Sequence, residues 1–191
     1  PTIRPGMIRG YSWQAIAHGA DAVLHFRWRT ACTGAEMFWH GLLDHDNIPG
    51  RRYREFEQLC AEVADWQELD GSRVENRVAI LYGSDQEYAF KLQPQVDGMY
   101  YMEQLKLFHD GFTACGVGVD LIDENSDLSG YQVAVAPTLF VEKQQIADRL
   151  CEVARRGGTV VLTNRSGVKD EYNQCVMEAL PGIFAGLAGV T

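Results

Sequence analysis

The chain has 191 residues, of which 46% are hydrophobic and 23% are charged, and these proportions are typical of a folded globular protein. Its formal net charge of -9 argues against nucleic acid and anionic membrane as partners, because both attract basic surfaces. The sequence also lacks an apolar run close to the roughly 20 residues that a membrane-spanning helix needs.

Five cysteines are spaced widely and irregularly, and no two of them form a C-x-x-C pair. This pattern predicts reduced thiols in a cytoplasmic protein, most of them packed as small apolar residues. The histidines considered as metal ligands, His40, His45 and His109, have no spacing typical of a metal site with Asp44 and Asp46. We therefore expect neither a metal nor another cofactor.

The beginning of the sequence predicts a helix, a strand and a second helix. Pro5 near a first turn and apolar residues at three- and four-residue spacing indicate a helix that ends at Gly19. The apolar stretch Ala22–Trp28 predicts a strand, and the small-residue loop Thr30–Gly34 leads into a helix that opens with Glu36. A strand needs partners, so we expect the tail of a repeating β/α structure, with apolar surface left exposed on this strand. Because the sequence does not begin with Met, we also expect it to be a piece of a longer polypeptide.

The next segment predicts a turn, a helix and a domain boundary. Residues 44–50 contain the Asn, Asp, Pro and Gly that are typical of turns. Apolar residues over 53–66 recur on one face of an amphipathic helix. The polar stretch 69–73 predicts a hinge, so we expect one domain over 1–70 and another over 73–191.

From Arg77 onward, short apolar runs alternate with helical patterns. The predicted strands are Val78–Tyr82, Val117–Ile122, Val133–Ala136 and Thr159–Leu162. The predicted helices have apolar faces formed by Tyr101, Leu105, Phe108 and Phe112, and by Ile146, Leu150, Val153 and Ala154. Continuous β-branched runs separated by helices indicate an α/β fold, with a parallel sheet covered by helices on both faces.

The end of the first predicted strand is the best candidate for a ligand site. Glu36, Trp39 and His40 would project from one side of a helix just beyond it, where ligands bind in β/α barrels. A carboxylate that accepts hydroxyl hydrogen bonds beside an indole would suit a sugar. The alternative is that Trp39 belongs to the core and Glu36 is a solvated acid at a helix start. Trp28 lies between two arginines, which could orient pocket carboxylates or form structural ion pairs.

The second half of the chain offers fewer candidates. The loop Gly83–Tyr88 follows the first strand of the sheet, where a flavodoxin-like fold would hold phosphate, and its acidic residues disfavour that ligand. Neither Cys115 nor Cys151 has the glycine context of the nucleophile elbow that an amidotransferase needs. The polar loop Arg165–Asn173 lies at the carboxyl edge of the sheet and is either a contact surface or a solvated loop.

Several strings resemble one enzyme family over essentially the whole chain. The end of the catalytic barrel of family 42 glycoside hydrolases, the bacterial β-galactosidases, is similar to PGMIRGYSWQAIAHGADAVLHFRWR and GAEMFWHGLLDHDN. The trimerisation domain of that family is similar to RVAILYGSDQEYAF, DLSGYQVAVAPTLF and RRGGTVVLTNRSGVKDEYN. The resemblance implies a flavodoxin-like or class I glutamine amidotransferase-like sheet, preceded by the last helix, strand and helix of a TIM barrel.

The resemblance also implies an activity. Family members are retaining glycosidases that use two glutamates to hydrolyse terminal β-galactosyl groups. Both glutamates are expected upstream of Pro1, so this chain should contain no catalytic residue and be inactive alone. Glu36 matches the galactose-binding glutamate, Trp39 stands where many members have the histidine that completes this contact, and His40 follows it. The expected substrate-binding residues are therefore Glu36, Trp39, His40 and Trp28.

Assembly is the other property that the resemblance implies. We expect residues 73–191 to build a homotrimer, with Ser166, Lys169, Asp170 and Asn173 in contact with a neighbouring subunit. The expected substrate is a galactoside, and an arabinoside stays open. Two alternatives also stay open for the second domain: an independent amidotransferase-like or flavodoxin-like ligand-binding module, or a purely structural oligomerisation domain.

Overall fold

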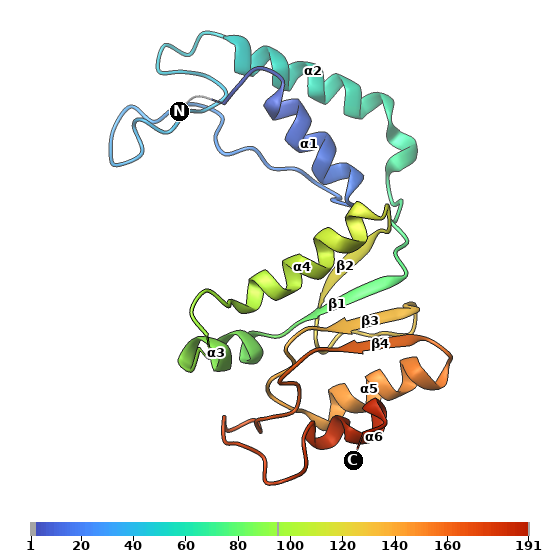
Figure 1. Cartoon of the computed structure of the whole chain (residues 1–191). Coiled ribbons are helices and arrows are strands. Elements are labelled where there is room, and N and C mark those ends of the chain that lie inside the picture. The colour runs from blue at the N-terminus through green and yellow to red at the C-terminus, as the bar shows by residue number, and fades with distance from the viewer. Residues whose placement is uncertain (1–2, 95, 191) are drawn as a thin grey trace. The chain divides into compact units, whose positions relative to one another are not determined.

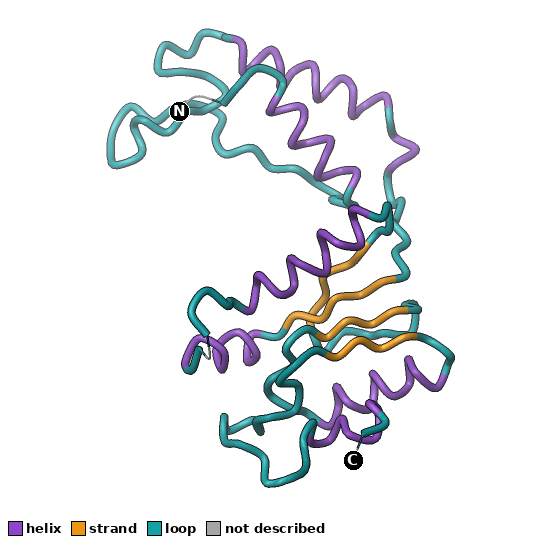
Figure 2. Tube along the Cα trace, in the orientation of Figure 1, coloured by secondary structure: helices purple, strands orange, loops and turns teal. Residues whose placement is uncertain are grey.

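The computed structural model describes residues 3–94 and 96–190. The chain consists of two compact units, Pro1–Val74 and Glu75–Thr191 (Figure 1). The elements of the first unit are α1 (Met7–Ala17), α2 (Arg51–Asp65) and the 3-10 helix η1 (Gln67–Leu69). Those of the second unit are β1 (Val78–Tyr82), α3 (Ser84–Leu92), α4 (Tyr101–Ala114), β2 (Val119–Asp123), β3 (Val133–Ala136), α5 (Gln144–Arg155), β4 (Thr159–Leu162), η2 (Gly182–Phe184) and α6 (Ala185–Ala188). Figure 2 shows the described part of the first unit as helices joined by long loops, without a strand.

In the first unit, α1 packs against α2. The core between them consists of the buried Ile8, Leu42 and Leu59, with Trp13 and Phe56 packed against it. Both helices are predicted correctly from the sequence, because their apolar residues recur at helical spacing and meet in this core.

The predicted strand over Ala22–Trp28 does not form. The segment is extended and keeps the alternation of a strand: Leu24, Phe26 and Trp28 are 95%, 68% and 58% exposed, while His25 is half-buried. Within the described residues, no segment pairs with it to form a ladder, and a strand exists only through its pairing. The expected exposure of apolar surface on this segment is confirmed.

The predicted helix that opens with Glu36 does not form either, because the chain must double back here. Leu43 forms a parallel bridge with Arg29, and the N–H of Leu42 donates to the carbonyl of Arg27 over 2.8 Å. For Leu43 to lie beside Arg29 with the chain running in the same direction, the residues between them must first lead the chain back in a loop. Residues 31–40 therefore form turns, one of which is closed by the Trp39 N–H bond to the Glu36 carbonyl over 3.0 Å.

In the second unit, the four described strands form one parallel sheet in the order β2-β1-β3-β4. Val78 pairs with Val119 on one side and with Val133 on the other, and Val133 pairs with Thr159 of the edge strand β4. This is the order of the first four strands in the flavodoxin-like doubly wound arrangement. The predicted α/β class with a parallel sheet is confirmed.

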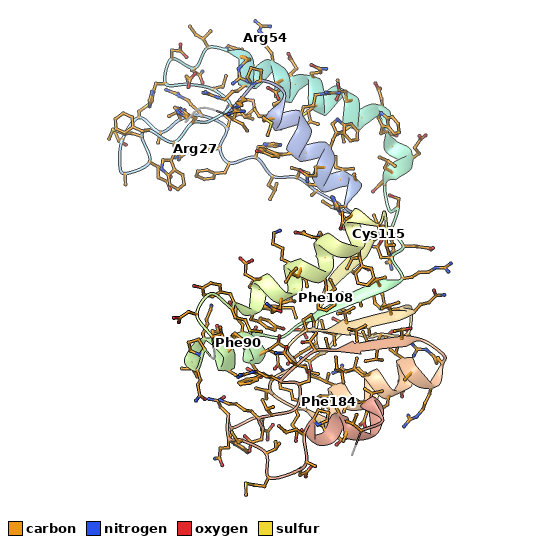
Figure 3. All side chains as sticks on the ribbon, viewed as in Figure 1. Arg27, Arg54, Phe90, Phe108, Cys115 and Phe184 are labelled. Carbon is orange, nitrogen blue, oxygen red and sulfur yellow. The ribbon has the colours of Figure 1, made fainter. Side chains whose placement is uncertain are left out.

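Helices cover both faces of this sheet, α3 and α4 on one and α5 and α6 on the other (Figure 1). Successive residues of β1 point to opposite faces, as the pleat requires. Val78 and Ile80 join the core with α4, whereas Ala79 and Leu81 join the core with α5. Phe184, labelled in Figure 3, is fully buried in the core with α5.

The loop predicted after the first strand of the sheet is largely a helix, α3. Its buried residues are the polar Gln86 and the apolar Ala89 and Phe90. Gln86 donates to the Val141 carbonyl over 2.9 Å and accepts the Val141 N–H over 2.7 Å. Its amide also donates to Glu124, whose other oxygen accepts from Lys143 over 2.7 Å. The carboxyl edge of the sheet beside β1 is therefore filled by a hydrogen-bonded polar cluster.

Candidate functional site

The carboxylate of Glu36 is oriented by an ion pair. The Arg27 Nη1 donates to Glu36 Oε2 over 2.9 Å, and both side chains are partly exposed. The guanidinium also lies over the ring of Phe26, 4.9 Å from its centroid. Figure 3 labels Arg27 in the loop-rich part of the first unit. The ion pair uses one carboxylate oxygen, and each oxygen of a carboxylate can accept more than one hydrogen bond.

The loop that carries Glu36 is fixed at both ends. The hydroxyl of the buried Thr30 lies 3.1 Å from the Leu43 carbonyl, to which it donates, and accepts the Gly41 N–H over 2.9 Å. The buried Arg52 of α2 donates through Nε to the Gly41 carbonyl over 2.8 Å and pairs with Asp44. These bonds hold the start and the end of the loop against α2.

A cleft of about 390 Å³ lies next to this loop, within the first unit. Trp39 and His40 line it, together with Phe26, whose ring meets the exposed indole of Trp39 edge-on at 6.4 Å. An exposed indole beside a cleft can stack on the apolar face of a sugar ring. Of the four residues predicted to bind substrate, the structure thus brings Trp39 and His40 to the cleft.

The other two predicted residues lie outside the residues that line the cleft. Glu36 is next to Trp39 in one turn of the chain, with its carboxylate held by Arg27. Trp28 packs edge-on against Tyr53 of α2, with ring centroids 5.7 Å apart. Trp39 is exposed, so its predicted alternative place in the core is wrong.

His45 and Arg52 are functional candidates that the spacing of residues in the sequence does not reveal. His45 was considered only as a metal ligand, yet its ring contacts the backbone carbonyls of Ala31 and Met37. Arg52 gave no signal, because an arginine at a helix start is usually solvated. Contacts of a side chain to a distant backbone have no sequence signature, so neither residue could be found from spacing.

The loop predicted to contact a neighbouring subunit is tightly bonded within the second unit. Lys169 is 4% exposed, and its Nζ donates to Asn173 Oδ1 over 2.8 Å and to Gln93 Oε1 over 3.3 Å. Ser166 is also buried. The Asp170 carboxylate accepts two backbone N–H groups of its own loop. Asn173 is exposed, whereas Ser166 and Lys169 are inside the fold.

A larger open pocket of about 1390 Å³ lies between the ends of α1 and α2 and is lined by Trp13, Phe56 and Trp66 among others. The two indoles meet edge-on at 6.1 Å. Glu62 lies at this pocket, where hydrogen bonds from Arg9 and then from the Trp13 indole hold the pKa of its carboxyl below its ordinary value. Nothing in the residue pattern of the sequence predicts this pocket.

Two family models cover the two units. Residues 76–191 match the β-galactosidase trimerisation domain, and residues 1–66 match the β-galactosidase model of glycoside hydrolase family 42. The chain belongs to the family 42 β-galactosidases. The resemblance that the sequence analysis found is therefore confirmed.

Individual relatives in this β-galactosidase family match nearly the whole chain. This chain is 51% identical over 190 residues to β-galactosidase BgaA of Clostridium cellulovorans, and the match covers 99% of this chain and 29% of that protein. The crystal structure of β-galactosidase from Marinomonas ef1 has a TM-score of 0.90 and 27% identity, over 98% of this chain and 29% of that one. The β-galactosidase of Halorubrum lacusprofundi has a TM-score of 0.88 and 36% identity, over 98% of this chain and 28% of that one. The chain thus spans less than one third of these relatives.

Membership of the β-galactosidase family does not favour the alternative of an independent amidotransferase-like or flavodoxin-like module, because the matches run through both units. No described helix is long and apolar enough to cross a membrane. Within residues 3–94 and 96–190, no group of three His, Cys, Asp or Glu side chains is placed to hold a metal ion. All five cysteines are free, and four are exposed, so the prediction that most are packed inside is wrong.

Proposed function

We propose that this chain is part of a cytoplasmic, homotrimeric β-galactosidase that hydrolyses terminal non-reducing β-D-galactose residues with retention. Residues 1–70 complete its catalytic barrel and residues 73–191 form its trimerisation domain. The observation that supports this most strongly is the match of family 42 models to both units, together with 51% identity to a β-galactosidase over 99% of the chain. Free cysteines are consistent with a reducing compartment.

In this proposal the chain binds the galactosyl group and supplies no catalytic residue. The two catalytic carboxylates belong to the rest of the enzyme, where one acts as nucleophile and the other as acid and base. Glu36 accepts hydrogen bonds from sugar hydroxyls, because the ion pair with Arg27 orients its carboxylate. Trp39 packs against the sugar ring, His40 offers a ring nitrogen at the cleft, and Trp28 stiffens the segment beside it.

Replacing Glu36 by glutamine in the full-length enzyme tests this role. The amide has the shape of the carboxylate but not its charge, and a hydrogen bond to a charged group is worth about 2 kcal/mol, so KM for a nitrophenyl galactoside should rise about 30-fold. Steady-state kinetics measure the change. Glu57→Gln, on the exposed face of α2, is the matched control and should leave KM unaltered. Equal KM values for both variants would contradict the proposed binding site.

For assembly, we propose that the loop containing Ser166, Lys169, Asp170 and Asn173 contacts a neighbouring subunit. Ser166 and Lys169 would shape the loop from inside, while Asn173 and the exposed Tyr172 would present its outer surface. An exposed tyrosine on an ordered loop is typical of protein interfaces.

Tyr172→Glu therefore should convert the full-length trimer to smaller species at micromolar concentration, because it places a charge where the proposed subunit contact would bury an aromatic ring. Light scattering over a concentration series measures the mass. Tyr100→Glu, at another exposed tyrosine of the second unit, is the control and should stay trimeric. A Tyr172→Glu enzyme with the mass of the wild type would place the contact elsewhere.

A further inference from the structure

His45 lies beside the loop that carries Glu36. Its ring nitrogen Nε2 is 2.8 Å from the carbonyl oxygen of Met37 and 3.1 Å from that of Ala31. Ala31 is at the start of the loop, and Met37 directly follows Glu36. One nitrogen therefore connects both ends of the stretch that contains the proposed sugar-binding carboxylate.

The chemistry of the two contacts determines the state of this nitrogen. Carbonyl oxygens only accept hydrogen bonds, so Nε2 must carry the hydrogen and donate it to both. Three-centre bonds of this kind, in which one N–H is shared between two carbonyls, also occur at helix termini. A glutamine side chain could make the same two bonds, because its amide group has two N–H donors.

The backbone around His45 is itself fixed. Its carbonyl accepts from Arg29 Nη2 over 3.2 Å. The preceding residue, Asp44, pairs with the buried guanidinium of Arg52 in α2. The backbone of His45 is thus anchored next to α2, and its imidazole ring contacts the loop around Glu36, which has no regular secondary structure.

We infer that His45 is a positioning residue for Glu36. Through the carbonyls of Ala31 and Met37 it holds the loop in the conformation in which Arg27 meets the Glu36 carboxylate. Without these bonds the loop keeps its two fixed ends but samples other conformations, and the carboxylate is in its binding position for a smaller fraction of the time. The effect on substrate binding rests on the proposed function of Glu36, whereas the hold on the loop does not.

The test compares His45→Ala, His45→Gln and the control His18→Ala in the full-length enzyme. His18 is an exposed histidine at the end of α1, outside the loop. Hydrogen exchange of the amides in residues 31–38 reports the hold on the loop. Kinetics with a nitrophenyl galactoside report its effect on binding. We expect His45→Ala to speed exchange in this segment and to raise KM about fivefold with little change in kcat, as the loss of one hydrogen bond implies. His45→Gln should restore most of both, and His18→Ala should change neither.

Each result decides one part of the inference. Unchanged exchange in His45→Ala would overturn the positioning role, whatever the activity. Faster exchange with unchanged KM, in an assay where Glu36→Gln raises KM, would overturn its effect on binding. If Glu36→Gln also leaves KM unchanged while exchange is faster in His45→Ala and restored in His45→Gln, the proposed sugar-binding role of Glu36 fails and the hold of His45 on the loop stands.

Discussion

Replacing Lys169 by glutamate is expected to unfold the second unit of the enzyme at temperatures that the wild type withstands. The ammonium group is buried, donates to the side-chain oxygens of Asn173 and Gln93, and lies 5.0 Å from the centre of the Phe140 ring. A carboxylate there would lose the ammonium's bonds to these two oxygens and would lie at the negative face of an aromatic ring. We expect a loss of about 4 kcal/mol in the free energy of unfolding, since burial of an uncompensated charge is among the most costly changes.

Differential scanning calorimetry of the full-length enzyme measures this effect. Lys91→Glu is the matched control: Lys91 is on the exposed face of α3 and pairs with Glu87, so its reversal should leave the transition temperature nearly unchanged. Equal transition temperatures for the two variants would show that the Lys169 ammonium does not stabilise the loop. The comparison also matters for assembly, because loss of the trimer in a Lys169 variant would follow from unfolding and would not identify a subunit contact.

The central strands of the parallel sheet are the most predictable from the sequence, because both of their faces are buried. The predicted runs Val78–Tyr82, Val133–Ala136 and Thr159–Leu162 are the observed strands β1, β3 and β4. The strand predicted over Val117–Ile122 is β2 at Val119–Asp123. Local apolar runs carry the information for such strands, since helices cover them on both sides.

Elements whose position depends on distant polar contacts are not predictable in this way. In the helix α3, the fully buried Gln86 is bonded to Val141 and Glu124, which lie after other strands in the sequence. Its polar side chain and the acidic residues of the first turn favour a loop, although Ala89 and Phe90 are also buried in this helix. A glutamine in sequence indicates solvent, and only the fold shows that its amide has partners. The same reasoning applies to His45, which was considered for metal binding and instead contacts two carbonyls.

The segment around Glu36 shows a different limit. The alternation over Ala22–Trp28 correctly indicates an extended chain with two faces, but pairing decides whether that chain is a strand. The helix predicted at Glu36 does not form because the chain returns to pair Leu43 with Arg29, and this pairing has no signal in the local residue pattern. The candidate residues were therefore found by type and resemblance, while their arrangement came only from the structure.

This return of the chain depends on Gly41, and Gly41→Ala is expected to have a large effect on the site. An added Cβ would lie 2.6 Å from the carbonyl carbon of Arg29 and 2.6 Å from the nitrogen of Thr30, closer than real Cβ atoms approach. Both atoms belong to the backbone, so no flexible side chain can move aside. The segment must separate from Arg29 and Thr30, which breaks the bond from the Gly41 N–H to the Thr30 hydroxyl.

We expect this variant to lose about 3 kcal/mol in the free energy of unfolding, a loss typical of overpacking in a well-packed site. Its KM should rise more than that of Glu36→Gln, because the whole loop shifts.

Gly10→Ala is the matched control, since Gly10 lies inside α1 with no atom within 4 Å of an added Cβ. Alanine favours a helix by up to about 1 kcal/mol over glycine, so this variant should raise the transition temperature. The same substitution then changes stability in opposite directions at two positions of one unit. If Gly41→Ala kept both the wild-type stability and KM, residues 41–43 would not hold the binding loop, and the position of Glu36 would depend on Arg27 and His45 alone.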